Sequence, residues 1–236
     1  ATAIYSRDLA IQMCDGRVAV VVGDGPIALL NSILLRLSGF ETVLMIHGRS
    51  ENNRWAVRNG FFDRDDVISG RSDVPRNVTE RLAGELVDVV IICTPGEAVE
   101  QATMDALVYL KPGGLINFVS ASDTPVISLG QGDLNVEDLR RRNHSGIPTS
   151  GYAEEFRSAD GKVVNVTGQR GTSLAHIQSS IYMLIDNPEP FKKLITNVVQ
   201  ADKAASSISS AVEWSLGRGT GTRPMKTVIE FNRNSI

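Results

Sequence analysis

The chain has 236 residues, of which 42% are hydrophobic and 22% are charged, and its formal net charge is −3. This composition is typical of a soluble globular protein. It gives no electrostatic reason to expect a nucleic-acid partner, and no stretch approaches the roughly 18 apolar residues of a membrane span. The two cysteines, Cys14 and Cys93, lie far apart without metal-ligand spacing, and no signal-peptide pattern opens the chain. We therefore expect a cytoplasmic protein with reduced thiols.

Apolar runs of strand length alternate with helical patterns along most of the chain. The predicted elements are helix 2–14, strand 18–22, helix 26–38, strand 42–46, helix 51–59, strand 66–68, helix 76–85, strand 88–93, helix 97–110, a turn at 111–114, strand 115–119, strand 163–166, helix 173–185, an extended piece at 191–195, helix 202–216 and strand 225–231. This alternation indicates right-handed βαβ units. Six such strands are typical of an α/β doubly wound (Rossmann) parallel sheet of order 3-2-1-4-5-6. We expect a single domain over 1–236, with an irregular insertion at 120–160 and a helix–strand tail at 195–236.

The stretch at residues 17–28, RVAVVVGDGPIA, predicts a buried strand, a glycine turn and a helix start. Gly23 permits the sharp turn, Gly25 lets a ligand approach the backbone, and Pro26 suits the first helical turn. The N–H groups and the dipole of that helix start favour a pyrophosphate. Such turns also occur for purely structural reasons, so the strand before and the helix after carry the argument. The predicted dinucleotide-binding residues here are Gly23, Gly25, Pro26 and Ile27.

The end of the second strand, within MIHGRSENNR, bears on the choice of cofactor. NAD-preferring domains usually carry a carboxylate there for the ribose 2′-hydroxyl, and residues 47–49 lack one. Arg49 would offer a bidentate phosphate donor and Ser50 a hydroxyl, which favours NADP(H) over NAD(H). In the structural alternative, Ser50 only caps the next helix and Arg49 is solvated. The predicted contacts at this strand end are His47, Gly48, Arg49, Ser50 and Arg54.

Three residues lie at the end of the fourth predicted strand and directly after it, at the point where an open α/β sheet binds its ligands. These residues, Cys93, Thr94 and Pro95, are predicted neighbours of the cofactor. The alternatives are that Thr94 caps the helix near Glu97 and that Cys93 is a small buried apolar residue.

The polar segment at 120–160 contains the basic run Arg140-Arg141-Arg142, followed by His144. A basic loop could meet a phosphorylated substrate or a partner subunit. The alternative is that the run is a solvated face.

Several motifs, taken together and in order, resemble the C-terminal half of medium-chain dehydrogenases/reductases, the zinc-type alcohol and polyol dehydrogenase superfamily. They are VVVGDGPIALL at 20–30, LVDVVIICTPG at 86–96, MDALVYLKPGGLINFVS at 104–120 and the strand–helix–strand tail at 195–231. The resemblance implies that the nicotinamide ring lies near Phe118, Val119 and Ser120. It also implies a homodimer joined through strand 163–166.

The same resemblance implies an oxidoreductase acting on an alcohol, polyol or carbonyl compound. The zinc-binding catalytic half of that superfamily is not visible in the sequence, and no zinc site can be assembled from the three histidines. The catalytic residues are therefore unknown. The alternative is a non-catalytic nucleotide-binding or oligomerisation module. An unrelated Rossmann enzyme, such as a methyltransferase, is disfavoured by the tail.

Overall fold

The computed structural model describes residues 1–47, 55–70, 72–129, 132–148, 152–215, 218–219 and 224–231. Their contacts form two compact units, Ala1–Tyr182 and Met183–Ile236. The expectation of one domain over the whole chain stays a prediction. Among the described residues, no helix combines the length and apolar character needed to cross a membrane.

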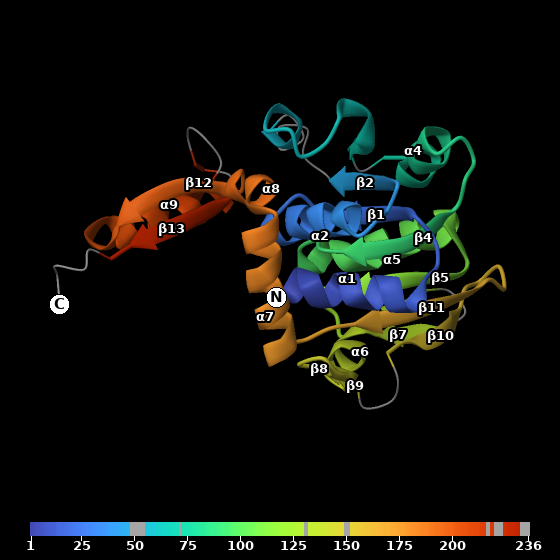
Figure 1. Ribbon diagram of the computed structural model, residues 1–236. Coiled ribbons are helices and arrows are strands. Elements are labelled where there is room, and N and C mark those ends of the chain that lie inside the picture. Colours follow the sequence, from blue (N-terminus) through green and yellow to red (C-terminus); the bar gives the residue numbers. More distant parts are fainter. Residues whose placement is uncertain are drawn as a thin grey trace. The chain divides into compact units, whose positions relative to one another are not determined.

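The first unit alternates strands and helices as the sequence pattern predicts (Figure 1). Its helices are α1 (Thr2–Met13), α2 (Pro26–Leu37), a helical stretch at 55–58, η1 (Arg64–Asp66), α4 (Val74–Arg81), η2 (Gly96–Ala98), α5 (Val99–Tyr109), α6 (Val136–Arg142) and the start of α7 (Leu174–Asp186). Its strands are β1 (Val18–Val22), β2 (Thr42–His47), β3 (Val67–Ser69), β4 (Val87–Ile92), β5 (Leu110–Phe118), β6 (Val126–Ser128), β7 (Asp133–Asn135), β8 (Asn143–His144), β9 (Ile147–Pro148), β10 (Glu154–Arg157) and β11 (Val163–Gly168).

The main sheet has seven strands in the order β10-β11-β5-β4-β1-β2-β3. The six strands from β11 to β3 are parallel, which confirms the predicted doubly wound order 3-2-1-4-5-6. The seventh strand, β10, runs antiparallel along β11 and was not expected. The prediction of a six-stranded sheet was therefore one strand short.

Helices cover both faces of this sheet, which is why its central strands are continuous apolar runs. Alternate residues of β1 point to opposite faces. Val20 packs on the face covered by α4, α5 and α6, whereas Val21 packs on the face covered by α1 and α2 (Figure 1). Because all five residues of β1 are buried, this strand lies at the centre of the core.

The antiparallel strand β10 corrects the predicted route to a dimer. Phe156 of β10 faces Val164 of β11 in the ladder, so the outer edge of strand 163–166 is already paired within the chain. A second copy cannot pair with that edge unless β10 leaves it. The sequence pattern hid this strand because Glu154-Glu155-Phe156-Arg157 is mostly charged.

The segment at 120–160 was predicted to be irregular, and its described part is instead folded. β6 and β7 form an antiparallel pair, as do β8 and β9, and α6 follows β7 directly. Asn135 starts α6, where its side-chain oxygen accepts a hydrogen bond from the Asp138 N–H at 2.9 Å. These strands have only two or three residues, which is too short for a periodic pattern to show in the sequence.

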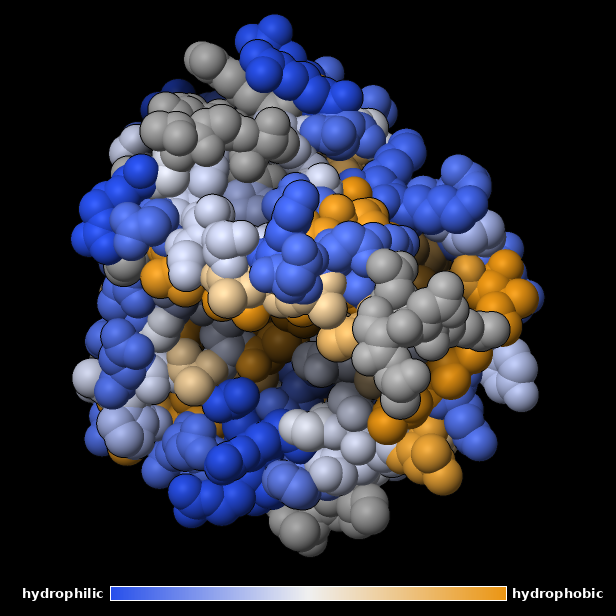
Figure 2. Space-filling view, turned by 90° about the vertical axis from the view of Figure 1, so that its left-hand side faces the viewer, coloured by the Kyte–Doolittle hydropathy of each residue, from blue (hydrophilic) through white to orange (hydrophobic). Residues whose placement is uncertain are grey.

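The second unit contains the end of α7 with α8 (Pro188–Lys192), β12 (Ile195–Gln200), η3 (Ala201–Lys203), α9 (Ala204–Ser215) and β13 (Lys226–Glu230). β12 and β13 pair in parallel, which confirms the predicted strand–helix–strand tail. The extended piece expected at 191–195 is wrong, since α8 runs to Lys192, a turn follows, and the strand β12 begins only at Ile195. Apolar side chains of α9, such as Ile208, are exposed. Figure 2 shows hydrophobic residues at the surface of one face of the molecule, among hydrophilic ones.

Lys162 closes the C-terminal end of α5. Its ammonium group donates hydrogen bonds to the carbonyl oxygens of Leu107 at 2.5 Å and Leu110 at 3.1 Å. These carbonyls have no partner within the helix, and a cation there also interacts favourably with the helix dipole.

Replacing Lys162 by Met should therefore lower the free energy of unfolding by about 1–2 kcal/mol, because it removes these charge-assisted hydrogen bonds. Urea unfolding followed by circular dichroism would measure the loss. The control is Lys192→Met, which removes an exposed ion pair with Glu189 and should cost less than about 0.5 kcal/mol. Equal losses in the two variants would contradict the capping role.

Candidate nucleotide site

The turn after β1 brings the backbones of β1 and β4 into close contact. Gly23 has φ +132°, and a Cβ atom there would lie 2.6 Å from the carbonyl oxygen of Cys93. The Gly23 N–H donates to the carbonyl of Ile46, and the Cys93 N–H donates to the carbonyl of Val22, both at 2.8 Å. Gly23 is therefore required by the fold itself, whatever ligand binds beside it.

Helix α2 begins directly after this turn, and its N-cap makes no side-chain hydrogen bond to the first N–H groups. Gly25 is the N-cap, Pro26 follows it, and no side-chain cap hydrogen bond is made. A Cβ atom at Gly25 would meet nothing within 4 Å, so the backbone borders open space. Ile27, in the first turn, is 38% exposed. A helix start with uncapped N–H groups facing open space suits an anion such as a pyrophosphate.

The residues after β4 lie beside this helix start. Asn31 of α2 is fully buried, and its amide donates to Cys93 Sγ at 3.7 Å. Burial raises the pKa of the Cys93 thiol to about 12, so it stays protonated near neutral pH. Asn31 was missed from the sequence; its only signal is a polar pair, Asn31-Ser32, in the apolar stretch of α2.

Thr94 carries a buried hydroxyl with no hydrogen-bond partner among the described residues. The expected alternative was that it caps the next helix. Instead, Pro95 is the N-cap of η2 and no side chain caps it. Buried polar atoms are nearly always hydrogen-bonded in native proteins. The Thr94 hydroxyl is thus the kind of group that a bound ligand would satisfy.

The end of β5 provides backbone rather than side-chain groups. Phe118 is fully buried in the core, so only its backbone could face a ligand. The N–H groups of Val119 and Ser120 both donate to the carbonyl of Ile92 at 3.1 Å. Val119 is partly buried against the cluster that also contains Cys93. The structure therefore brings the ends of β4 and β5 together, as the sequence predicts.

The end of β2 is described only as far as His47. His47 is buried, and its carbonyl accepts a hydrogen bond from the Gly70 N–H at 3.1 Å. The other predicted contacts at this strand end, Gly48, Arg49, Ser50 and Arg54, lie outside the described residues.

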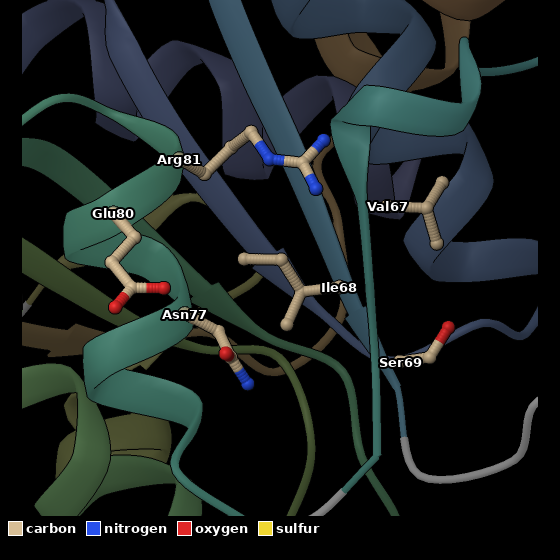
Figure 3. A pocket seen from close by; sticks show the side chains of 6 residues that line it. All are labelled: Val67, Ile68, Ser69, Asn77, Glu80 and Arg81. Atoms are coloured by element: carbon tan, nitrogen blue, oxygen red, sulfur yellow. The ribbon is translucent and has the colours of Figure 1, made fainter.

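A hollow of about 390 Å³ lies along the edge strand β3, next to α4. Val67, Ile68 and Ser69 line it from β3, and Asn77, Glu80 and Arg81 line it from α4 (Figure 3). Arg81 is held toward Asp65, 3.3 Å away. None of the predicted nucleotide-binding residues lines this hollow, so it is separate from the glycine turn.

The residues that the structure describes do not form a zinc site. They contain no group of three or more His, Cys, Asp or Glu side chains that could hold a metal ion. His47 is buried in β2 and His144 is exposed beside Ser145. His176 stacks on Tyr5 with ring centroids 4.4 Å apart. The zinc chemistry that the resemblance implies therefore has no ligands in this part of the chain.

No family model and no curated protein matches the sequence. An alcohol dehydrogenase from Thermotoga maritima matches with a TM-score of 0.68 and 15% identity, over 98% of this chain and 54% of its own. A 2R,3R-butanediol dehydrogenase from Bacillus subtilis matches with a TM-score of 0.65 and 18% identity, over 98% of this chain and 55% of its own. S. aureus TarJ, solved with NADPH, matches with a TM-score of 0.62 and 16% identity, over 98% of this chain and 62% of its own.

The chain thus spans less than two thirds of the length of these structures. At such identities the likeness concerns the fold. Alcohol, glucose and butanediol dehydrogenases are among the matched structures, and the main sheet of this chain has the doubly wound strand order. The chain therefore has a doubly wound α/β fold that resembles part of each of these dehydrogenase structures.

Proposed function

We propose that this chain binds a nicotinamide dinucleotide, NADP(H) in preference to NAD(H), as the nucleotide-binding part of an oxidoreductase. The observation that carries the proposal is the uncapped start of α2, where Gly25 borders open space at the switch point between β1 and β4. Ligands of open α/β sheets bind at this point, outside the carboxyl ends of the strands. TarJ, with a similar fold, was solved with NADPH.

Each part of the proposed site has one task. The first N–H groups of α2 would bind the pyrophosphate, and the orphaned Thr94 hydroxyl would hydrogen-bond to the cofactor. Arg49 and Ser50 would bind the ribose 2′-phosphate. The backbone after Phe118 would face the nicotinamide ring, which carries the hydride when bound. The protein's part is to hold that ring beside a substrate, which we propose is an alcohol, polyol or carbonyl compound.

The competing proposal is a module that binds the nucleotide without catalysis. It is favoured by the missing zinc ligands among the described residues. The two proposals share the nucleotide site and differ in turnover. Oxidation of bound NADPH in the presence of carbonyl compounds would distinguish them.

Two glycine substitutions separate the binding role from the folding role. Gly25→Val places its side chain in the open space where the pyrophosphate would lie, and φ −77° at this position suits any residue. We expect it to weaken NADPH binding at least about tenfold, with unfolding changed by less than about 1 kcal/mol. Gly23→Ala should instead destabilise the fold by about 2–3 kcal/mol, because of its positive φ and the Cys93 carbonyl.

Nicotinamide fluorescence would measure binding in these variants, and thermal unfolding would measure stability. NADPH binding that is unchanged in Gly25→Val would mean that the glycine turn is only structural.

Discrimination between the two cofactors tests Arg49. Titration of the purified chain should show tighter binding of NADPH than of NADH. Arg49→Ala should weaken NADPH binding by about tenfold or more and leave NADH binding nearly unchanged, since only NADPH carries the 2′-phosphate. Equal losses for both cofactors would contradict this role of Arg49, and no binding of either would overturn the proposed function.

We also propose that the chain forms a homodimer, now through the outer edge of β10 rather than β11. Two copies of β10 related by a two-fold axis would set Glu154 of each against Arg157 of the other, a favourable cross-strand pair. Light scattering at micromolar concentration should give twice the chain mass of 25.5 kDa. A monomer at that concentration would contradict the dimer.

A further inference from the structure

The basic run of α6 is divided by the fold into an outer and an inner part. Arg142 is partly exposed and donates to Glu154 at 2.7 Å, and it also pairs with Asp138. Arg140 lies two residues earlier and points the other way, against β11. The run is therefore more than a solvated face.

Arg140 packs onto the end of β11 at a position that only glycine allows. A Cβ atom at Gly168 would lie 2.5 Å from Cγ of Arg140. The Arg140 side chain is 16% exposed, and its Nε has no hydrogen-bond partner among the described residues. The charge is thus partly removed from water, and this burial lowers the pKa of the guanidinium. Such a cation gains much from an added anion.

One carboxylate lies between Arg140 and a second arginine. Glu137 Oε2 is 3.3 Å from Arg140 Nη1, and Glu137 Oε1 is 3.1 Å from Arg170 Nη1. Two cations thus share one anion, which leaves an excess of one positive charge in this group. Arg170 is 54% exposed, so the group is open to solvent on its side.

The backbone fixes Arg170 in place. The Arg170 N–H donates to the carbonyl of Asn143, and its carbonyl accepts from the Ser145 N–H at 2.7 Å. The preceding residue, Gln169, donates its N–H to the carbonyl of Phe118 at 3.2 Å. The arginine pair is therefore attached to the end of β5, where the nicotinamide is proposed to lie.

The register of the sheet gives the distance from the glycine turn. Val22, Ile92, Phe118 and Gly168 are partners in four adjacent strands. Three strand spacings separate the end of β1 from the end of β11, or about 14 Å. The proposed 2′-phosphate contacts follow β2 in the sequence, and β2 lies on the opposite side of β1. The backbone positions of the arginine pair are thus three strands away from the start of α2, on the side of β5.

We propose that Arg140 and Arg170, joined through Glu137, form a seat for the anionic group of a small substrate, a phosphate or a carboxylate. This inference rests on the proposed function, because the nicotinamide beside β5 makes this the substrate side of the site. The substrate is then an alcohol or carbonyl compound that carries an oxyanion. Both arginines are specificity-determining residues in this assignment.

The test is calorimetric titration of the NADPH-saturated chain with inorganic phosphate and, separately, with acetate, at constant ionic strength. Saturation with NADPH blocks the cofactor's own phosphate positions. We expect at least one anion to bind with a millimolar Kd, and Arg170→Gln to weaken it about tenfold. Arg170→Lys should keep part of the affinity because it keeps the charge. Arg142→Gln, the matched control, should bind as the unchanged chain does.

A second readout avoids substitution altogether. The side-chain Nε–H resonance of Arg140 should shift during the titration in the unchanged chain. Binding of phosphate but not acetate would identify a phosphate ester as the substrate class, and the reverse would identify a carboxylate. The seat is overturned if neither anion binds, if Arg170→Gln binds as well as the unchanged chain, or if the Arg140 resonance does not move.

The seat and the cofactor site can fail separately. NADPH binding to Arg170→Gln should equal that of the unchanged chain. If the unchanged chain does not bind NADPH, the proposed function fails, and the same titrations on the unliganded chain still decide the seat. If NADPH binds and neither anion does, only the seat fails.

Discussion

The close approach of two backbones at Gly23 is the constraint on which the rest of the site depends. The carbonyl of Cys93 lies where any side chain of residue 23 would begin, so β1 can turn away from the sheet only with glycine there. This turn places the start of α2 at the carboxyl end of β1, beside β4. Since α2 starts without a side-chain cap, its N–H groups stay available at the point where the strand order reverses.

A polar contact at the amino ends of β1 and β4 joins the same two strands. Buried Asp88, in β4, accepts a hydrogen bond from the Val18 N–H at 2.8 Å and also pairs with Lys111. Gly16 is needed there, because a Cβ atom would overlap the Asp88 carboxylate. Both ends of the β1–β4 pair are thus fixed by a glycine that admits a polar group of the neighbouring strand. This fixed register sets the positions of the binding groups.

The polar segment between β5 and β11 links the proposed cofactor site to the proposed substrate site. Its helix α6 lies over β11, and the loop after it is hydrogen-bonded to Arg170. Glycine again permits close packing here. The absence of a Cβ atom at Gly168 lets the Arg140 side chain approach the backbone, as the absence of one at Gly23 lets the Cys93 carbonyl approach. The antiparallel strand β10 then covers the edge of β11. The segment that the sequence pattern leaves irregular therefore covers one face of β11, fixes the position of Arg170 and pairs with the outer edge of β11.

The sequence by itself determined the α/β class, the order of the six parallel strands and the place of the glycine turn. It could do so because a strand buried on both faces must be continuously apolar, and because a sharp turn before a helix favours glycine and proline. Only the tertiary structure decided the role of single polar residues. The surroundings of these residues come from distant parts of the chain. Asn31 contacts Cys93, Arg140 packs on Gly168, and Arg170 pairs with Glu137. The tertiary structure likewise decided that residues 154–157 form strand β10. They pair with β11 through backbone groups, which all residues carry, so their charged side chains give no strand pattern in the sequence.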